Sequence, residues 1–225
     1  MAKQARRRIP RGLFITLEGP EGSGKSTQIR SLATALEQEG HEVLVTREPG
    51  GTAVAEAIRH TLLTAASHEP ITAETEALLI LAARSQHVTH GIRPALQRGA
   101  IVLCDRFSDS TIAYQGFGRG LNQTWLRSAN RIATSGLTPD LTLLLDLPVS
   151  VGLSRRQADR GGQNRLDRES RTFHETVRRG FLTLARKEPR RIKIIDADRP
   201  LTEVRADVEE IVLGWVTLRT RIRHR

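Results

Sequence analysis

A glycine-rich segment between residues 19 and 26 reads G-P-E-G-S-G-K-S and combines a lysine with a hydroxyl side chain. In this pattern backbone N–H groups surround a phosphate, Lys25 reaches the β- and γ-phosphates of a nucleoside triphosphate, and Ser26 ligates Mg²⁺. The alternative is a glycine-rich turn that only caps a helix, but such a turn needs neither the lysine nor the hydroxyl side chain. The segment therefore predicts ATP or GTP binding. The predicted ATP-binding residues are Gly19, Pro20, Glu21, Gly22, Ser23, Gly24, Lys25, Ser26 and Thr27.

Two aspartates stand at or near the ends of apolar segments, where an unpaired carboxylate is unfavourable. Asp105 ends the segment IVLCD, and Asp146 lies near the end of LTLLLDL. We favour Asp105 as the second Mg²⁺ ligand beside Ser26, because Arg106 follows it immediately. Asp146 remains the rival for the metal side.

Arginines are the third group of residues suited to phosphate chemistry. Arg47 follows an apolar segment and precedes Glu-Pro-Gly-Gly, and its planar guanidinium suits a phosphate dianion better than a lysine does. A surface arginine on a turn is the alternative for this position.

A second set of arginines surrounds the polar, glycine-rich loop at 159 to 168: Arg155, Arg156, Arg160 and Arg165. Cations on a mobile loop stabilise charge on a transferring phosphoryl group and help to exclude water. The segment 155–168 therefore predicts a lid, with Arg160 and Arg165 as its catalytic residues. A solvated basic loop is the alternative.

The elements that must position these residues alternate along the chain. Apolar segments predict strands at 12–19, 41–47, 101–105, 141–147 and 191–196, and helical patterns lie between them. One helical stretch covers 71–99 and contains Pro94, and another covers 108–135 with a glycine-rich break at 116–120. This alternation predicts an α/β fold with a parallel sheet, helices on both faces and ligands at the carboxyl ends of the strands.

Length and charge indicate one domain with basic ends. The chain has 225 residues, a length typical of one domain, and a formal charge of +10. Its single cysteine excludes an internal disulfide. Nine of these ten net charges lie in 1–12 and 219–225, so we expect basic, disordered tails at 1–11 and 219–225 and a nearly neutral single domain over 12–218. No apolar run of about 18 residues or signal-peptide core is present, so we expect a cytoplasmic protein without a membrane or a specific nucleic-acid partner.

Four motifs occur in a characteristic order: the glycine-rich segment, TREPGGT at 46–52, DRFSDSTIAYQG at 105–116 and PDLTLLLDL at 139–147. From about Gly12 to about Trp215 the chain resembles bacterial thymidylate kinases. The resemblance implies phosphorylation of dTMP to dTDP by Mg-ATP in dTTP biosynthesis. It also implies a P-loop NTPase fold of three α/β/α layers with a five-stranded parallel sheet, a mobile lid and a homodimer.

The resemblance further implies the roles of several residues. Arg47 and Arg106 would bind the acceptor or transferring phosphate, and Glu21 would contact the 3'-hydroxyl of dTMP, with a solvent-facing carboxylate as the alternative for Glu21. The implied catalytic set is Lys25, Arg47, Asp105, Arg106, Arg160 and Arg165.

The acceptor base would be bound by a separate group of residues. By resemblance, Arg84 reaches thymine O4, Thr111 reaches the N3/O4 edge, Tyr114 packs on the deoxyribose, and Gln115 is a further contact. A packed core tyrosine is the alternative for Tyr114. The family normally has a stacking Phe one turn before the base-reading arginine, and this chain has Ile80 there. The implied substrate-binding residues are Glu21, Arg47, Ile80, Arg84, Arg106, Thr111, Tyr114 and Gln115.

Three other functions stay open at this point. Ile80 is compatible with a kinase for another nucleoside monophosphate, and the basic ends are compatible with a P-loop ATPase that binds nucleic acid. A nucleotide-binding regulator without turnover is the third. A GTPase is disfavoured, because the base-reading pattern N-K-x-D is absent from the sequence.

Overall fold

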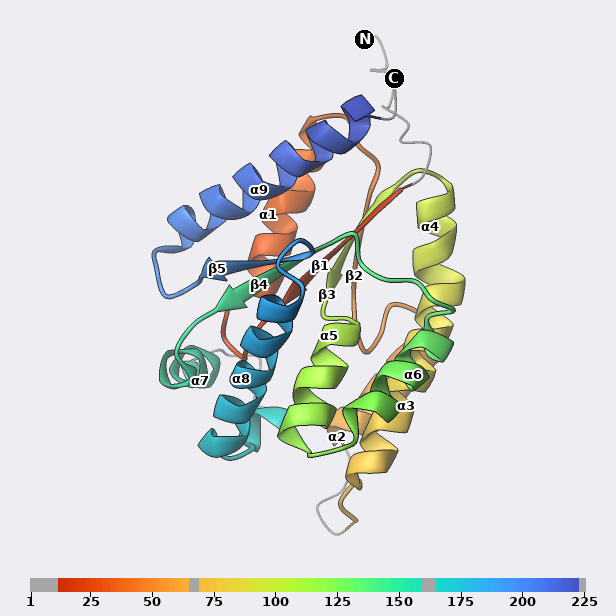
Figure 1. Cartoon of the computed structure of the whole chain (residues 1–225), viewed down its shortest axis with the longest axis vertical. Coiled ribbons are helices and arrows are strands. Elements are labelled where there is room, and N and C mark those ends of the chain that lie inside the picture. Colours follow the sequence, from red (N-terminus) through yellow and green to blue (C-terminus); the bar gives the residue numbers. More distant parts are fainter. Residues whose placement is uncertain (1–11, 65–68, 159–164, 223–225) are drawn as a thin grey trace.

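The computed structural model describes residues 12–64, 69–158 and 165–222, with side-chain surroundings to residue 219. Within these ranges the chain forms one five-stranded sheet in which every pair of neighbours is parallel, in the order β2-β3-β1-β4-β5 (Figure 1). The strands are β1 (Leu13–Glu18), β2 (Val43–Arg47), β3 (Ile101–Asp105), β4 (Leu141–Asp146) and β5 (Ile192–Asp196). The predicted parallel α/β fold is confirmed.

Helices cover both faces of the sheet. Those within the described ranges are α1 (Lys25–Gln38), α2 (Ala53–Thr64), α3 (Ala73–His87), α4 (Arg93–Gln97), α5 (Ser108–Thr111), α6 (Gln123–Ala133), α7 (Val149–Ala158), α8 (Arg171–Lys187) and α9 (Leu201–Ile222). Helices α1 and α9 pack together on one face, whereas α4, α5 and α8 lie on the other (Figure 1). The sheet therefore forms the middle of three layers.

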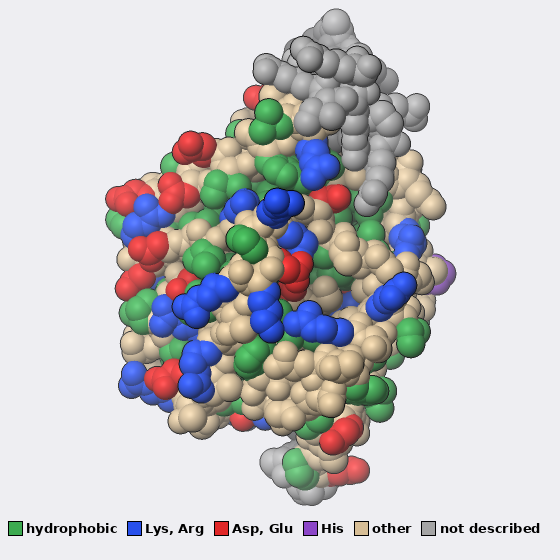
Figure 2. All heavy atoms as spheres, in the orientation of Figure 1, with side chains coloured by type: hydrophobic (Ala, Val, Ile, Leu, Met, Phe, Trp, Pro, Cys, Tyr) green, Lys and Arg blue, Asp and Glu red, His purple; other side chains and the backbone are tan. Residues whose placement is uncertain are grey.

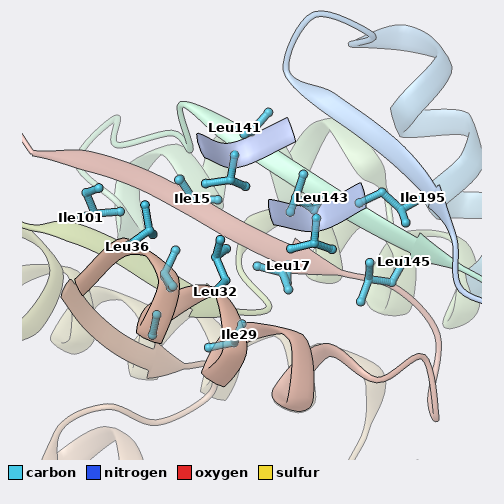
Figure 3. Close-up of a cluster of buried hydrophobic side chains, with 14 of the residues drawn as sticks. Ile15, Leu17, Ile29, Leu32, Leu36, Ile101, Leu141, Leu143, Leu145 and Ile195 are labelled. Atoms are coloured by element: carbon cyan, nitrogen blue, oxygen red, sulfur yellow. The ribbon is translucent and has the colours of Figure 1, made fainter. Parts of the chain in front are cut away.

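The core shows why the three central strands, β1, β3 and β4, are almost wholly apolar. Alternate residues of a strand point to opposite faces, so Ile15 and Leu17 of β1 pack on the side of α1, while Phe14 packs on the side of α4. Figure 3 shows Leu32 of α1 beneath the sheet, in the cluster that includes Leu143 of β4. Because both faces are covered, neither set of side chains can be polar without a partner.

The predicted helical stretch over 71–99 is divided in the structure. A π-helical segment, Val88–Ile92, separates α3 from α4, and Pro94 lies in the first turn of α4. Proline has no N–H to donate and is tolerated at the first turn of a helix. Because Pro94 cannot donate to a carbonyl of the preceding turn, the α-helical hydrogen-bond pattern is interrupted there, and the wider π-helical turn lies directly before it.

The basic charge of the chain is not confined to its two ends. Figure 2 shows Lys and Arg side chains gathered across the face that α5, α6 and α8 form in Figure 1. Arg127 and Arg131 on α6 are exposed, and so are Arg186 and Lys187 at the end of α8. The near-zero net charge of the body therefore hides an uneven distribution. Helix α9 also extends to Ile222, into the segment expected as a tail.

None of the described helices is both long and apolar enough to cross a membrane.

Candidate active site

The phosphate loop connects β1 to α1, as the sequence predicts. Gly19, Gly22 and Gly24 have φ angles of 142°, 71° and 85°, a region that residues with a Cβ atom rarely adopt. Lys25 is the first residue of α1, so the N–H groups at the start of this 14-residue helix face the loop. The loop thus has the backbone geometry that phosphate binding requires.

Lys25 lies folded over the loop with only 7% of its surface exposed. Its Nζ donates to the carbonyl oxygens of Gly19 at 3.2 Å and Pro20 at 2.9 Å and to Ser23 Oγ at 3.1 Å. Burial, together with the nearby charge of Arg106, lowers the pKa of Lys25 to about 8. A phosphate oxygen would supply the negative charge that these neutral acceptors do not.

Helix α7 docks on the phosphate loop through two glycines. A Cβ atom on Gly22 would lie 2.1 Å from the carbonyl oxygen of Gly152, and one on Gly152 would lie 2.3 Å from the carbonyl oxygen of Glu21. Backbone therefore meets backbone between the phosphate loop and the helix that leads into the predicted lid.

The two predicted metal ligands lie together. Ser26 Oγ donates to Asp105 Oδ2 at 2.7 Å, because β3 pairs with β1 and ends beside the phosphate loop. Asp146 instead accepts two hydrogen bonds from Arg178, at 2.7 and 2.8 Å, and is not among the residues that line the cleft described next. The geometry favours Asp105 over Asp146.

A cleft of about 760 Å³ opens over the phosphate loop at the carboxyl edge of the sheet. Among its described lining side chains, five are acidic and eight are basic, which suits a polyphosphate. The basic ones are Lys25, Arg30, Arg47, Arg59, Arg106, Arg155, Arg156 and Arg165. Sequence reasoning missed Arg30 and Arg59. Arg59 lies on α2 and donates to Pro49 O at 3.0 Å, and only its position one helix after the Arg47 loop could have indicated it.

Arg47 lines the cleft but is paired with a neighbouring helix. Its Nη2 lies 3.1 Å from both carboxylate oxygens of Glu56 on α2, and 55% of its side chain is exposed. An exposed pair of this kind is weak, so a phosphate dianion can compete for the guanidinium.

Arg106 lies between the phosphate loop and α5. Its backbone has a φ of 68°, and its Nη1 donates to Gly19 O at 3.0 Å and to Ser110 Oγ at 3.2 Å. Its Nη2 donates to Glu21, which also accepts from the Tyr114 hydroxyl at 2.8 Å. Burial alone would raise the pKa of Glu21, but Arg106 and Lys25 lower it. Glu21 therefore faces its partners in the cleft and is only 14% exposed.

A smaller pocket of about 60 Å³ continues the cleft toward α3 and α5 and shares Glu21, Ile80 and Arg106 with it. Its lining brings together the predicted base-reading and sugar-contacting residues: Glu21, Ile80, Arg84, Arg106, Thr111, Tyr114 and Gln115. The segments that supply them are far apart in sequence. The structure thus assembles the whole predicted acceptor set except Arg47, which stays in the larger cleft.

Arg84 is held by four groups. Its Nε donates to Glu48 Oε2 at 2.6 Å, and its Nη1 donates to Thr111 Oγ at 2.7 Å and to Asn130 Oδ1. Its Nη2 donates to Phe107 O at 3.0 Å. These described partners occupy four of the five N–H donors of a guanidinium. Arg84 is 1% exposed and can offer a bound base only its remaining Nη2–H.

Phe107 does not replace the aromatic ring that Ile80 lacks. It is fully buried, it packs edge-on against Phe14 with ring centroids 4.8 Å apart, and it is not among the residues that line the acceptor pocket. Ile80 and Leu166 supply apolar surface to that pocket. His87 is a buried hydrogen-bonding residue, because its ring nitrogens lie 3.1 Å from Glu48 Oε1 and 2.7 Å from Thr46 Oγ1.

Of the two predicted lid arginines, Arg160 lies outside the described residues. Arg165 lines the cleft, and its Nη2 donates to Glu76 Oε2 at 2.5 Å. Glu76 also accepts from Gln115 at 2.7 Å and from Arg119. The lid residue and the acceptor-pocket residue Gln115 thus share one buried carboxylate, which sequence reasoning did not identify.

Glu18 is a second carboxylate that sequence reasoning missed. It ends β1, directly before the phosphate loop, and is 1% exposed. Burial and the nearby charge of Asp109 raise the pKa of Glu18 to about 7. Its position at the end of an apolar strand is the same signal that indicated Asp105.

Comparison with known proteins agrees with this geometry. Residues 17–208 match the family model described as thymidylate kinase. The chain is 55% identical to the thymidylate kinase of Thermomicrobium roseum over 86% of this chain and 90% of that one. It is 51% identical to the thymidylate kinase of Pseudomonas savastanoi pv. phaseolicola over 92% of this chain and 98% of that one. The chain belongs to the thymidylate kinase family.

Proposed function

We propose that this protein transfers the γ-phosphoryl group of ATP to dTMP, giving ADP and dTDP, and that it serves dTTP synthesis in the cytoplasm. The observation that carries the proposal is the continuity of the two cavities. The phosphate-loop cleft opens into the small pocket, and Glu21 and Arg106 line both. A donor and an acceptor bound in them would meet beside Lys25 and Arg106, and the family membership supports this reading.

In the proposed reaction an acceptor phosphate oxygen attacks the γ-phosphorus in line. The new P–O bond forms as the bond to the ADP oxygen breaks. The protein then contributes position and positive charge rather than a nucleophile. Lys25 holds the β- and γ-oxygens, and Arg47 and Arg106 hold the acceptor phosphate.

Magnesium fits the residues present at the edge of the loop. The Ser26 hydroxyl and the Asp105 carboxylate are hard oxygen donors 2.7 Å apart, and Mg²⁺ is commonly held by one or two such side chains together with substrate phosphates. When bound, the ion would neutralise negative charge on the phosphates.

The acceptor pocket suits a pyrimidine deoxynucleotide. Arg84, with one remaining N–H, and Thr111, with its hydroxyl, both line the pocket, and these groups can be matched by a thymine carbonyl and N3. Tyr114 is fixed by Glu21, so its ring can pack against a sugar without a 2'-hydroxyl. Glu21 lines the same pocket beside Tyr114 and would accept a hydrogen bond from the 3'-hydroxyl.

The lid arginines complete the proposed catalytic set. Arg165 already lies in the cleft, paired with Glu76, and it can exchange this partner for a phosphoryl group when ATP binds. Arg160 is assigned the same role from its sequence position alone.

We also propose a homodimer formed through α3 and α6. These two helices pack together and expose Leu78, Trp125 and Ile132, whose relative exposures are 56%, 39% and 80%. Such apolar exposure on adjacent helices is typical of an interface. Mass measurement in solution should find a dimer that Ile132→Glu dissociates, while Ile194→Glu, on the exposed side of β5, leaves it intact. A wild-type monomer at micromolar concentration would contradict the proposal.

The function is tested by ADP release from Mg-ATP with each of dTMP, dUMP, dCMP, dAMP, dGMP, UMP, CMP, AMP and GMP, with polynucleotide, and without acceptor. The proposal expects strong preference for dTMP. Preference for another monophosphate would keep the kinase and reject the substrate. ADP release that requires polynucleotide would reject the kinase and would make the basic face of α6 and α8 the candidate nucleic-acid contact.

A further inference from the structure

Glu18 joins the phosphate loop to the segment that carries Arg106. Its Oε1 accepts from the backbone N–H of Phe107 at 2.7 Å and of Ser110 at 3.3 Å. Its Oε2 accepts from the Ser110 hydroxyl at 2.6 Å. Three donors from one short segment thus converge on a single buried carboxylate that belongs to the neighbouring strand.

These contacts hold the backbone of Arg106. The N–H of Arg106 donates to Leu17 O at 3.0 Å, and the next N–H along the chain, of Phe107, donates to Glu18. Arg106 lies between these two bonds with a φ of 68°, which is strained for a residue with a side chain. Such a conformation persists only where the surroundings impose it, and here β1 imposes it through two consecutive residues.

The same carboxylate also reaches the guanidinium of Arg106. Ser110 Oγ accepts from Arg106 Nη1 at 3.2 Å and donates its proton to Glu18. Glu18 therefore acts on both ends of Arg106, directly on its backbone and through one hydroxyl on its side chain. The next residue, Thr111, accepts a hydrogen bond from Arg84, so two consecutive residues at the end of α5 bond to Glu18 and to the acceptor pocket.

The surroundings show that Glu18 is retained against an unfavourable environment. It is buried beside the like charge of Asp109, and the stabilising influences on its charge are the Ser110 bond, Arg106 and the Phe107 N–H. Burial of a carboxylate is unfavourable for folding unless hydrogen bonds or opposite charges compensate it, and groups with strongly perturbed pKa values are concentrated at functional sites. No bond that Glu18 makes lies away from the Arg106 segment among the described residues.

We propose that Glu18 is a positioning residue that fixes Arg106, backbone and guanidinium together, in the orientation that receives the acceptor phosphate. This inference rests on the proposed phosphoryl transfer. It assigns to the last residue of β1 a function in the acceptor site, although the residue belongs to the strand that leads to the ATP site.

The variant Glu18→Gln keeps the shape and removes the charge. At pH 8, where Glu18 is mainly charged, we expect the variant to lower kcat/KM for dTMP roughly 10- to 100-fold, as for the loss of hydrogen bonds to a charged group. The KM for ATP should stay within about threefold of the wild type. Ser110→Ala removes only the link to the guanidinium and should give a smaller loss of about 3- to 10-fold. Glu18→Asp, which restores the charge at a shorter reach, should recover part of the activity.

Asp140→Asn is the matched control. Asp140 Oδ2 also accepts from the backbone of β1, from Phe14 N–H at 2.9 Å, but at the amino edge of the sheet. It should change the melting temperature without changing kcat/KM more than about twofold. An equal loss of activity in both variants would reduce the role of Glu18 to general stability and overturn the inference.

A double-mutant cycle with Arg106→Lys decides the mechanism. If Glu18 acts through the Arg106 guanidinium and backbone, Glu18→Gln should cost little further activity in the Arg106→Lys background. If the two losses multiply, or if Glu18→Gln behaves as the wild type, the inference is wrong. The wild-type acceptor panel tests the function separately, and the cycle is run on whichever monophosphate the wild type prefers.

Discussion

The donor side and the acceptor side of the cleft are built in different ways. The phosphate loop is contiguous, from 19 to 27, and Lys25 donates to two carbonyl oxygens and a hydroxyl, with no carboxylate among its hydrogen-bond acceptors in the described part of the chain. The acceptor pocket is assembled from segments as distant as Glu48 and Thr111, and its central Arg84 is already bound to four protein groups. The donor side thus keeps its main cation for the ligand, whereas the acceptor side uses its cations to hold itself together.

This difference predicts that variants on the donor side change chemistry and that variants on the acceptor side change stability as well. The following tests address that contrast, beginning with the largest expected effect.

Lys25→Ala should reduce kcat about 10³-fold, because positive charge aimed at the transferring phosphoryl group is lost. It should not lower the free energy of unfolding, because Lys25 is buried with a depressed pKa and contributes unfavourably to folding when charged. Steady-state kinetics and urea unfolding measure the two quantities. A clear decrease in the free energy of unfolding would show that the donor side, like the acceptor side, uses its cation for stability, and would contradict the difference between the two sides.

Glu48→Ala should lower the free energy of unfolding by about 3 to 5 kcal/mol, because it leaves the Arg84 guanidinium buried without its carboxylate. It should also raise the KM for dTMP, since Arg84 loses its orientation. Asp146→Ala is the control, because it breaks the more exposed pair with Arg178 and should change stability by about 1 kcal/mol. Equal effects from the two would mean that burial does not set the difference.

ATP affinity should fall as the pH rises above about 8. The folded pKa of Lys25 lies below its usual 10.5, so its unfavourable contribution to folding is fully present below pH 8 and disappears between about pH 8 and 10.5. Bound phosphate needs the charged form, so the Kd for ATP should rise up to about tenfold per pH unit above 8. Calorimetry in Lys25→Met should show no such slope, and a slope retained there would assign the titration to another group.

Ile80→Phe should give the smallest effect, a decrease in the KM for dTMP of about fivefold, since stacking on a base contributes roughly 1 to 3 kcal/mol. Ile80 lines both cavities, so a ring there can reach the base. Val54→Phe, at an exposed position of α2, is the control and should leave the KM unchanged. An unchanged or higher KM in Ile80→Phe would place that side chain away from the base.

The same contrast explains what the sequence could and could not predict. The phosphate loop was predictable because all its parts are adjacent in the chain. The central strands β1, β3 and β4 were predictable because burial on both faces demands apolar residues. The pairing of Ser26 with Asp105 followed from the parallel sheet, which brings strand ends to one edge.

Long-range pairs between side chains could not be predicted in this way. No periodicity indicates that Arg84 would meet Asn130, or that Glu76 would bind Arg165 across 89 positions of sequence. Glu18 was within reach of the argument made for Asp105, but its three donors come from a segment whose strained turn at Arg106 has no signal in the sequence. The division of the helical stretch before α4 likewise needed coordinates, since Pro94 is compatible with several kinds of break.

The contact between Gly22 and Gly152 has a consequence for how this sequence can vary. A methyl group at either position would overlap a carbonyl oxygen of the opposite backbone, and a backbone carbonyl cannot move aside as the end of a flexible side chain can. Two positions 130 residues apart must therefore both be glycine, because the backbone at each one leaves no room for a Cβ atom at the other. A library that randomises the region around α7 should recover glycine at 152 whatever ligand is used for selection. The close approach of the phosphate-loop backbone thus restricts which residues can occur in α7, the helix before the predicted lid.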